Sequence, residues 1–147
     1  MVLYSHTLEG ISAAQLSGGF FEGWPDPPSP ETHLRILGGS GEVILAVDEE
    51  SDAVVGFTAA VTDGVLCAHI TLLEVLPKYR GRDVGRGLVE RMLGRMERLY
   101  AVDVTCEPDL RPFYASLGLR PTAGMVLRRY ANQSGLPPGG SGEDTVY

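Results

Sequence analysis

The chain has 147 residues, of which 44% are hydrophobic and 21% are charged. This composition is that of an ordinary globular domain and excludes a collagen-like or wholly disordered chain, and the length favours a single domain. No apolar run approaches the roughly 20 residues that a membrane helix needs, and the first residues lack the pattern of a secretory signal. Two cysteines, Cys67 and Cys106, are too few for a disulfide framework. We therefore expect a cytoplasmic protein without a membrane partner.

The formal net charge of −7 is unevenly distributed along the chain. Residues 1–77 carry 11 acidic residues and 1 basic residue, whereas residues 78–98 carry 7 basic and 3 acidic residues. A protein that binds nucleic acid is usually basic overall, so we expect no nucleic-acid partner. The short basic region suits a compact anionic ligand, or it is simply an arginine-rich helix.

The hydrophobic pattern predicts alternating strands and helices in one domain over residues 1–131. Ser29 and Pro30 indicate a helix start, the Asp63-Gly64 pair is typical of a hairpin turn, and Gly118 is a typical helix end. The order of elements predicts an α/β (α+β) sandwich with a mostly antiparallel sheet. The tail, residues 132–147, is rich in Gly, Pro and Ser and is expected to be disordered. We expect strands at 2–7, 42–47, 53–61, 65–76, 101–106 and 125–130, and helices at 12–16, 30–37, 84–100 and 109–117.

The segment with the clearest chemistry is residues 73–89, in which a strand leads through a loop rich in Gly and Arg into an amphipathic helix. A helix N-terminus offers unpaired N–H groups and a partial positive charge, and glycines let an anion approach the backbone. These features predict a cradle for a pyrophosphate. The segment lacks the Gly-Lys-Ser/Thr of a P-loop and the Gly-x-Gly-x-x-Gly of a Rossmann turn.

This segment resembles the GNAT superfamily, the acetyl-CoA-dependent N-acyltransferases. The matching residues read Val75-x-Pro77-x-Tyr79-Arg80-Gly81-x-x-Val84-Gly85-x-x-Leu88, and a second motif, Phe113-Tyr114-Ala115-Ser116-Leu117-Gly118-Leu119, follows about 30 residues later. The resemblance covers about residues 1–131. It implies a GNAT-like fold in which the fourth and fifth strands splay apart to hold acetyl-CoA.

Two positions depart from the family pattern. Asp83 stands where the family usually has Gly, and Glu107 where many relatives carry an Asn that contacts the pantetheine arm. An Asp at a helix start caps the N–H groups that a pyrophosphate would use, and its charge repels phosphate. The carboxylate of Asp83 therefore either points outward or weakens cofactor binding.

The resemblance also implies the residues that contact the cosubstrate, and no metal is expected. Pantetheine would pair with the strand around Leu73 and Val75, and the backbone N–H of Val75 would stabilise the oxyanion. Tyr114 would donate a hydrogen bond to the leaving thiolate. The full set of expected acetyl-CoA contacts is Leu73, Val75, Arg80, Gly81, Arg82, Asp83, Val84, Gly85, Arg86, Glu107 and Tyr114.

The general base stays open between two residues and a bound water. By simple alternation, His69, Thr71, Leu73 and Val75 share one face of the fourth strand. His69 is then near the amine acceptor, or it is an ordinary rim histidine bonded to backbone. Glu74 faces the opposite side unless a bulge re-aims it.

The acceptor site is expected to include Phe20, Phe21 and Trp24 together with His69 and Thr71, although the aromatic residues equally suit anchors for a proline-rich loop. The leading hypothesis is an N-acetyltransferase that acts on a small primary amine. The alternatives are an acyl-CoA-binding module with little turnover and an enzyme that acetylates protein N-termini or lysines. A homodimer is possible, because relatives are often dimers.

Overall fold

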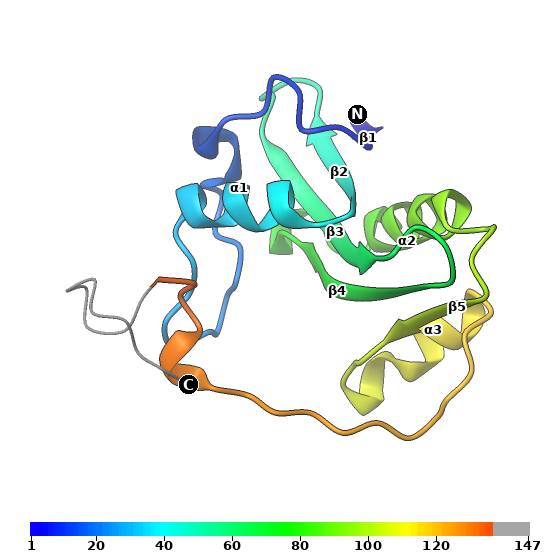
Figure 1. Cartoon of the computed structure of the whole chain (residues 1–147). Helices are drawn as coiled ribbons and strands as arrows, with labels where there is room; N and C mark the ends of the chain where they lie inside the picture. Colours follow the sequence, from blue (N-terminus) through cyan, green and yellow to red (C-terminus); the bar gives the residue numbers. More distant parts are fainter. Residues whose placement is uncertain (137–147) are drawn as a thin grey trace.

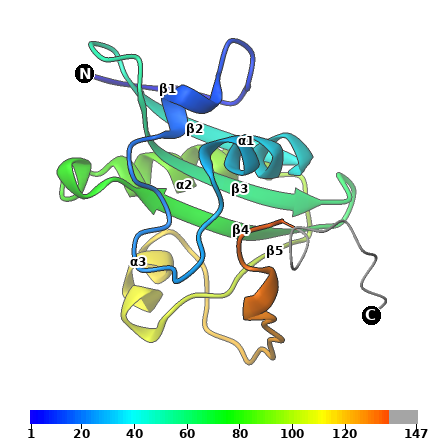
Figure 2. The same ribbon diagram turned by 90° about the vertical axis from the view of Figure 1, so that its left-hand side faces the viewer.

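The computed structural model describes residues 1–136. One sheet forms the middle layer, and its strands lie in the order β1-β2-β3-β4-β5. Helix α1 covers one face of this sheet, and α2 and α3 lie on the other (Figure 1, Figure 2). The strands are β1 (Val2–Ser5), β2 (Glu42–Asp48), β3 (Val54–Thr62), β4 (Cys67–Val75) and β5 (Ala101–Val104), and the α-helices are α1 (Pro30–Gly39), α2 (Val84–Arg95) and α3 (Arg111–Ser116).

The sheet confirms the predicted fold class. Strands β1 to β4 pair antiparallel in sequence order, and β5 pairs parallel with β4. The parallel ladder is short, because it begins at Cys67 opposite Ala101 and ends at Ile70 opposite Val104. Beyond Ile70, no strand of residues 1–136 lies beside the outer edge of β4.

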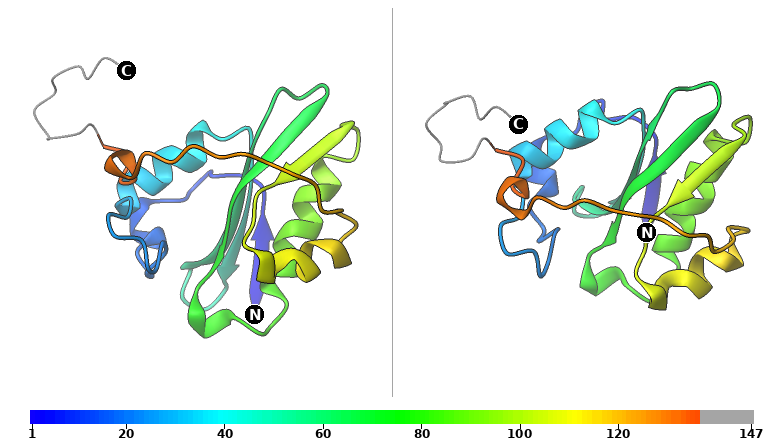
Figure 3. Two further views of the ribbon diagram at one scale, coloured as in Figure 1. Left: turned by 90° about the horizontal axis from the view of Figure 1, so that it is seen from below. Right: turned by 60° about the horizontal axis from the view of Figure 1, so that its bottom comes forward.

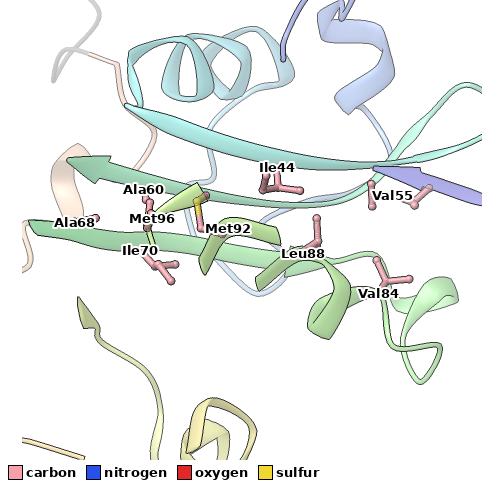
Figure 4. Packing of buried hydrophobic residues seen from close by; sticks show 10 residues of the cluster. Ile44, Val55, Ala60, Ala68, Ile70, Val84, Leu88, Met92 and Met96 are labelled. Atoms are coloured by element: carbon pink, nitrogen blue, oxygen red, sulfur yellow. The ribbon is translucent and has the colours of Figure 1, made fainter. Parts of the chain in front are cut away.

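Two buried clusters, one on each face of the sheet, hold the layers together. The cluster under α2 includes Ile44, Val55, Leu88 and Met92 (Figure 4). Gly87 brings α2 close to β1, because a Cβ atom at this position would overlap the hydroxyl of Tyr4. The apolar spacing of the 84–96 segment therefore produces a helix with one face pressed onto the sheet.

The structure corrects several predicted boundaries. Helix α2 ends at Arg95 instead of residue 100, because the chain must turn in order to begin β5 at Ala101, level with the start of β4. The connection between β3 and β4 spans residues 63–66 and is longer than a two-residue turn. Asp63 Oδ1 stabilises it by accepting the N–H groups of Val65, Leu66 and Cys67.

The predicted last strand, residues 125–130, is wrong. The described chain from 119 to 129 forms no helix or strand, and a short 3₁₀ helix follows at Tyr130–Asn132. Residues 120–131 are all exposed, and no strand within residues 1–136 pairs with them. Of the tail that was expected to be disordered, residues 132–136 are described and Gln133 accepts a hydrogen bond from the N–H of Asp26. Residues 137–147 lie outside the described part.

Candidate active site

The edge of β4 that faces away from β3 carries backbone groups that pair with no strand beyond Ile70 within residues 1–136, and of these the carbonyl of Val75 accepts a hydrogen bond from Arg80 Nε. The N–H of Leu76 and the carbonyl of Leu72 both bond to β3, at Val55 O and Thr58 Oγ1. Backbone groups of alternate residues point to opposite edges of a strand, so those of Leu73 and Val75 point away from β3. They lie beyond Ile70, where the ladder with β5 has ended.

A β-bulge at Thr71 reverses which residues of β4 share a face. Ala59 pairs with Leu72 and Ala60 pairs with Ile70, so Thr71 has no partner in β3. Leu73 and Val75 consequently pack on the α2 side, as Ile70 does, while Leu72 packs on the α1 side.

The bulge corrects the predicted face. His69, Thr71, Leu73 and Val75 do not lie together, because the alternation is interrupted between Ile70 and Leu72. Glu74 instead points to the α1 side, where its Oε1 accepts the N–H of Phe21 at 2.8 Å. The sequence left open whether a bulge turns the Glu74 side chain to the other face of β4, and the structure shows that it does.

Glu74 has the environment of a carboxyl group that can exchange a proton. Burial raises its pKa above the ordinary value, and this effect outweighs the hydrogen bond from Phe21 and the charge of Arg80, which lower it. His69 is half-buried on β4, and Thr71 Oγ1 donates to the carbonyl of Ala59 at 3.2 Å.

The start of α2 has the features expected of an anion site. Asp83 occupies the N-cap position, but its side chain makes no capping hydrogen bond, so within residues 1–136 no side chain caps the first N–H groups of α2. Asp83 has φ 60°, a left-handed conformation that favours glycine. Gly81 is also left-handed, with φ 76°, and at Gly85 the nearest atom to an added Cβ would be 3.8 Å away.

The loop before α2 is fixed by side-chain contacts. Tyr79 donates its hydroxyl hydrogen to Asp48, and the guanidinium carbon of Arg82 lies 5.5 Å from the centre of the Tyr79 ring. Arg80 Nε donates to the carbonyl of Val75 at 3.0 Å. The loop is thus held against both β2 and the end of β4.

Helix α3 carries Tyr114 and is tied to α2. Arg86 Nη2 donates to Ser116 Oγ at 2.6 Å, which ties α3 to the first turn of α2. Tyr114 is only 5% exposed, and burial together with the neighbouring Cys106 raises its pKa to about 12. Its phenol therefore keeps its proton at neutral pH. Glu107 is exposed at the start of the turn that precedes α3.

Comparison with known proteins agrees with this geometry. Residues 12–119 match the family model described as Acetyltransferase (GNAT) family. This chain belongs to the GNAT acetyltransferase family. A protein from Deinococcus radiodurans R1, provisionally described as an acetyltransferase, is 46% identical with a TM-score of 0.88, and the match covers 92% of this chain and 94% of that one.

More distant GNAT structures share the architecture. A GNAT family protein from Streptococcus pneumoniae TIGR4 is 26% identical, with a TM-score of 0.65 and coverage of 88% of this chain and 98% of that chain. The aminoglycoside N-acetyltransferase AAC(6')-Iy in complex with CoA is 15% identical, with a TM-score of 0.64 and coverage of 88% and 94%. Among curated proteins, none matches significantly.

Residues 1–136 of this GNAT chain contain neither a metal-binding cluster nor a membrane-spanning helix. These residues contain no group of three or more His, Cys, Asp or Glu side chains placed to hold a metal ion. No helix among them is both long and apolar enough to cross a membrane.

The three aromatic residues predicted to line the acceptor site differ in how exposed they are. Phe21 is 3% exposed and lies among His33 and Phe57, so it is an anchor of the proline-rich loop. Phe20 is half-buried against the same two rings. Trp24 is 37% exposed, with its ring centre 4.8 Å from that of Phe21, and of the three it is the most accessible to a substrate.

His33 is a buried residue beside the site that the sequence reasoning did not single out. It is 1% exposed, its ring centre is 4.4 Å from that of Phe57, and its Nε2 has no hydrogen-bond partner among the described residues. It lies four positions before buried Leu37 in α1, and this helical spacing was its only signal in the sequence. Burial lowers its pKa to about 4, so the imidazole is neutral at pH 7.

We expect His33 to destabilise the fold in acid. The pKa of His33 is lower in the folded chain than in the unfolded chain. The folded state therefore keeps its full free energy of unfolding above pH 6.5 and loses part of it as the pH falls to about 4. A shift of this size corresponds to about 3 kcal/mol in the free energy of unfolding. His33→Leu should remove that part of the pH dependence in urea titrations at pH 7 and pH 4. The exposed control His6→Leu should retain it, and equal pH dependence in the two variants would contradict the assignment.

Proposed function

We propose that this chain transfers an acetyl group from acetyl-CoA to a primary amine. The observation that carries the proposal is the uncapped start of α2, which follows a β4 edge that pairs with no strand beyond Ile70 within residues 1–136. The buried, protonated Tyr114 of α3, a helix tied to α2 through Ser116, supports it. The pyrophosphate would lie on the loop and the first turn of α2. The pantetheine arm would pair with the backbone of Leu73 and Val75. CoA binding by AAC(6')-Iy, the GNAT structure named above, supports this choice of cosubstrate.

The proposed reaction is direct attack of a neutral amine on the thioester carbonyl. The amine nitrogen forms a bond to the carbonyl carbon, the bond from that carbon to sulfur breaks, and one proton passes from the nitrogen to the sulfur, so that CoA leaves as a thiol. Glu74 takes the proton that the ammonium loses, for which its raised pKa is suited. The N–H of Val75 stabilises the negative oxygen, and Tyr114 donates a hydrogen bond to the departing thiolate.

Glu74 is favoured over His69 as the base for a geometric reason. Glu74 lies at the end of β4 next to Val75 and is bonded to the loop that carries Trp24. His69 pairs with Val61 of β3 and Asp103 of β5, in the part of the sheet where the parallel ladder is closed. A base must reach the amine at the point where the thioester lies, and the open part of β4 begins after the bulge.

We propose a small amine as the acceptor. The first 77 residues carry 11 acidic residues and 1 basic residue, which would attract a cationic amine. Trp24 offers an exposed aromatic surface on the loop that the hydrogen bond from Phe21 to Glu74 holds in place. These features support a small amine over a protein N-terminus or lysine.

A thiol-release assay tests the proposed reaction. Purified protein, acetyl-CoA and a panel of small primary amines and lysine peptides would be followed by the appearance of free CoA. Reactions without amine measure background hydrolysis. Release that depends on a small amine is expected and eliminates the reading of a binding module. Release only with peptides would contradict the small acceptor, and background rates with every amine would contradict the enzyme.

Asp83→Gly should leave acetyl-CoA affinity unchanged or improve it. The carboxylate caps nothing, and glycine adopts φ 60° without strain. We expect the free energy of unfolding to stay the same or to rise by up to about 1 kcal/mol. Asp52→Gly is a matched control, because Asp52 has φ 61° in the β2–β3 turn and its substitution should not alter affinity. A large loss of affinity in Asp83→Gly alone would show that the carboxylate is a needed part of the loop.

A further inference from the structure

Phe21, in the loop before α1, combines a strained backbone with a buried side chain. It has φ 64°, in the left-handed region that is unfavourable for a residue with a Cβ atom. Two other left-handed positions of the same loop are glycines, Gly19 with φ 107° and Gly23 with φ 84°. A phenylalanine between them persists in this conformation only because its surroundings hold it there, and such residues cluster at functional sites.

The ring of Phe21 provides this hold by packing onto the α1 side of the sheet. Its centre lies 4.9 Å from that of His33 and 6.1 Å from that of Phe57. Phe57 of β3 pairs directly opposite Glu74 of β4, so the ring is fixed against the cross-strand neighbour of Glu74. Figure 3 shows α1 and the segment before it on one side of the sheet, and α2 and α3 on the other.

The backbone of Phe21 fixes one oxygen of the Glu74 carboxyl group. The N–H of Phe21 donates to Oε1 at 2.8 Å, and burial of the ring sets the direction of this N–H because both belong to one residue. Among residues 1–136, no group donates a hydrogen bond to Oε2. One carboxyl oxygen is therefore held by the protein, and the other remains available to receive a proton.

The remaining charges around Glu74 are less directional. Burial raises the pKa of Glu74, the N–H of Phe21 and the charge of Arg80 lower it, and the charge of Glu22 raises it. Arg80 and Glu22 form an ion pair of 3.6 Å in which both side chains are exposed, so solvent weakens their effects. His33, beside the ring of Phe21, is neutral at pH 7 because burial lowers its pKa to about 4. The N–H of Phe21 is thus the contact that both orients the carboxylate and favours its ionised form.

We propose that Phe21 is a positioning residue for Glu74: its buried ring holds a strained backbone whose N–H fixes Oε1 and leaves Oε2 to take the proton of the amine. This inference rests on the proposed function, in which Glu74 is the base. The N–H of Trp24 donates to the carbonyl of Phe21 at 3.1 Å, so the loop that carries Trp24 also sets the orientation of the base.

An exchange of amide for ester at Phe21 tests the N–H without changing the side chain. Phenyllactic acid in place of Phe21 keeps the ring and replaces the N–H by an oxygen atom that cannot donate. The bond from Phe21 lowers the pKa of Glu74, so its loss should raise that pKa. We expect the acidic limb of kcat/KM to move to higher pH by about one unit. The ¹³C titration of the Glu74 carboxyl group, assigned by its absence in Glu74→Gln, should move in the same direction.

The same exchange at Ile11 is the matched control. The N–H of Ile11 donates to the carbonyl of Leu8 at 3.0 Å, and both residues pack against the same buried cluster as Phe21. This ester removes one backbone hydrogen bond without touching Glu74 and should leave the ¹³C titration of Glu74 in place. An unchanged titration in the Phe21 ester, or equal shifts in the two esters, would overturn the inference. A wild type that releases no CoA with any amine would contradict the proposed reaction alone, and the ¹³C titration would then decide the inference.

Side-chain variants test whether the ring acts through Glu74. Phe21→Ala removes the ring that holds the N–H and should lower kcat by about 10- to 100-fold. In a Glu74→Gln background the same change should cost little more, because residues that act through one another are not additive. Phe20→Ala removes a ring from the same cluster, and any effect that it has should be equal in the two backgrounds. Equal losses from Phe21→Ala in both backgrounds would show a packing role alone and refute the positioning role.

Discussion

Replacement of Glu74 by glutamine is expected to lower turnover by about 100- to 10,000-fold, the usual contribution of a general base. Glutamine keeps an oxygen that can accept the N–H of Phe21, so the loop that Glu74 holds should remain in place. What is lost is the proton acceptor. Steady-state kinetics with a responsive amine would measure the effect on kcat, with KM for acetyl-CoA expected to stay nearly constant.

The pH profile distinguishes a base from a structural residue. Glu74 acts only when ionised, so kcat/KM of the wild type should fall as the pH drops through its raised pKa. That acidic limb should be missing in Glu74→Gln. A raised pKa in the folded chain also means that ionised Glu74 costs stability as the pH rises through it, so the variant should be at least as stable at pH 7. Loss of stability together with activity would point to a structural role, and retained activity would remove Glu74 from the mechanism.

Tyr114→Phe is expected to lower turnover by about 10- to 100-fold. The phenol has a pKa of about 12, so it donates a hydrogen bond to the thiolate more readily than it gives up its proton. Its contribution should therefore be at or below the lower end of the range for acid catalysis. Phenylalanine fills the same buried volume beside Phe113, so packing should be kept.

Two observations identify the cause of the Tyr114 effect. Acetyl-CoA affinity should change little in the variant, and so should its thermal midpoint. Phe113→Leu, next to Tyr114 in α3, is a control that changes the packing without removing the hydroxyl. Unchanged turnover in Tyr114→Phe, or an equal loss in Phe113→Leu, would contradict the role of the hydroxyl group.

The sequence predicted those parts of the fold that depend on local pattern. The apolar spacing after Val84 produced the helix, and Ser29 with Pro30 marked the start of α1, where Ser29 Oγ accepts the N–H of Thr32. The loop between β4 and α2 was recognisable because its glycines and arginines form a short contiguous motif. The helix start and the glycines and arginines expected to bind the cosubstrate lie within a few residues of one another.

Other features depend on partners that sequence spacing does not reveal. The bulge at Thr71 arises from pairing with β3 and reverses the faces of β4, so simple alternation wrongly grouped Leu73 and Val75 on one face with His69. Residues 125–130 have the composition of a strand, but they form no strand within the described residues 1–136. His33 is buried by aromatic residues from distant segments, among them Phe57.

Asp83 illustrates the same limit at the site. The sequence places an acidic residue at a helix start, where capping is the usual outcome. The structure instead gives Asp83 a left-handed backbone and no capping bond. The conformation explains why glycine suits this position and why the carboxylate does not occupy the N–H groups of α2.

Calorimetric titration with acetyl-CoA, with free CoA as a comparison, measures whether the loop before α2 binds the cosubstrate. We expect micromolar binding to the wild type. We also expect loss of binding in Gly85→Asp, where the fold has room for a side chain but the added carboxylate would lie at the first turn of α2. Gly94→Asp, in the same helix and with no atom within 4 Å of an added Cβ, should bind normally. Absence of binding heat from the wild type at millimolar acetyl-CoA would contradict acetyl-CoA as the cosubstrate.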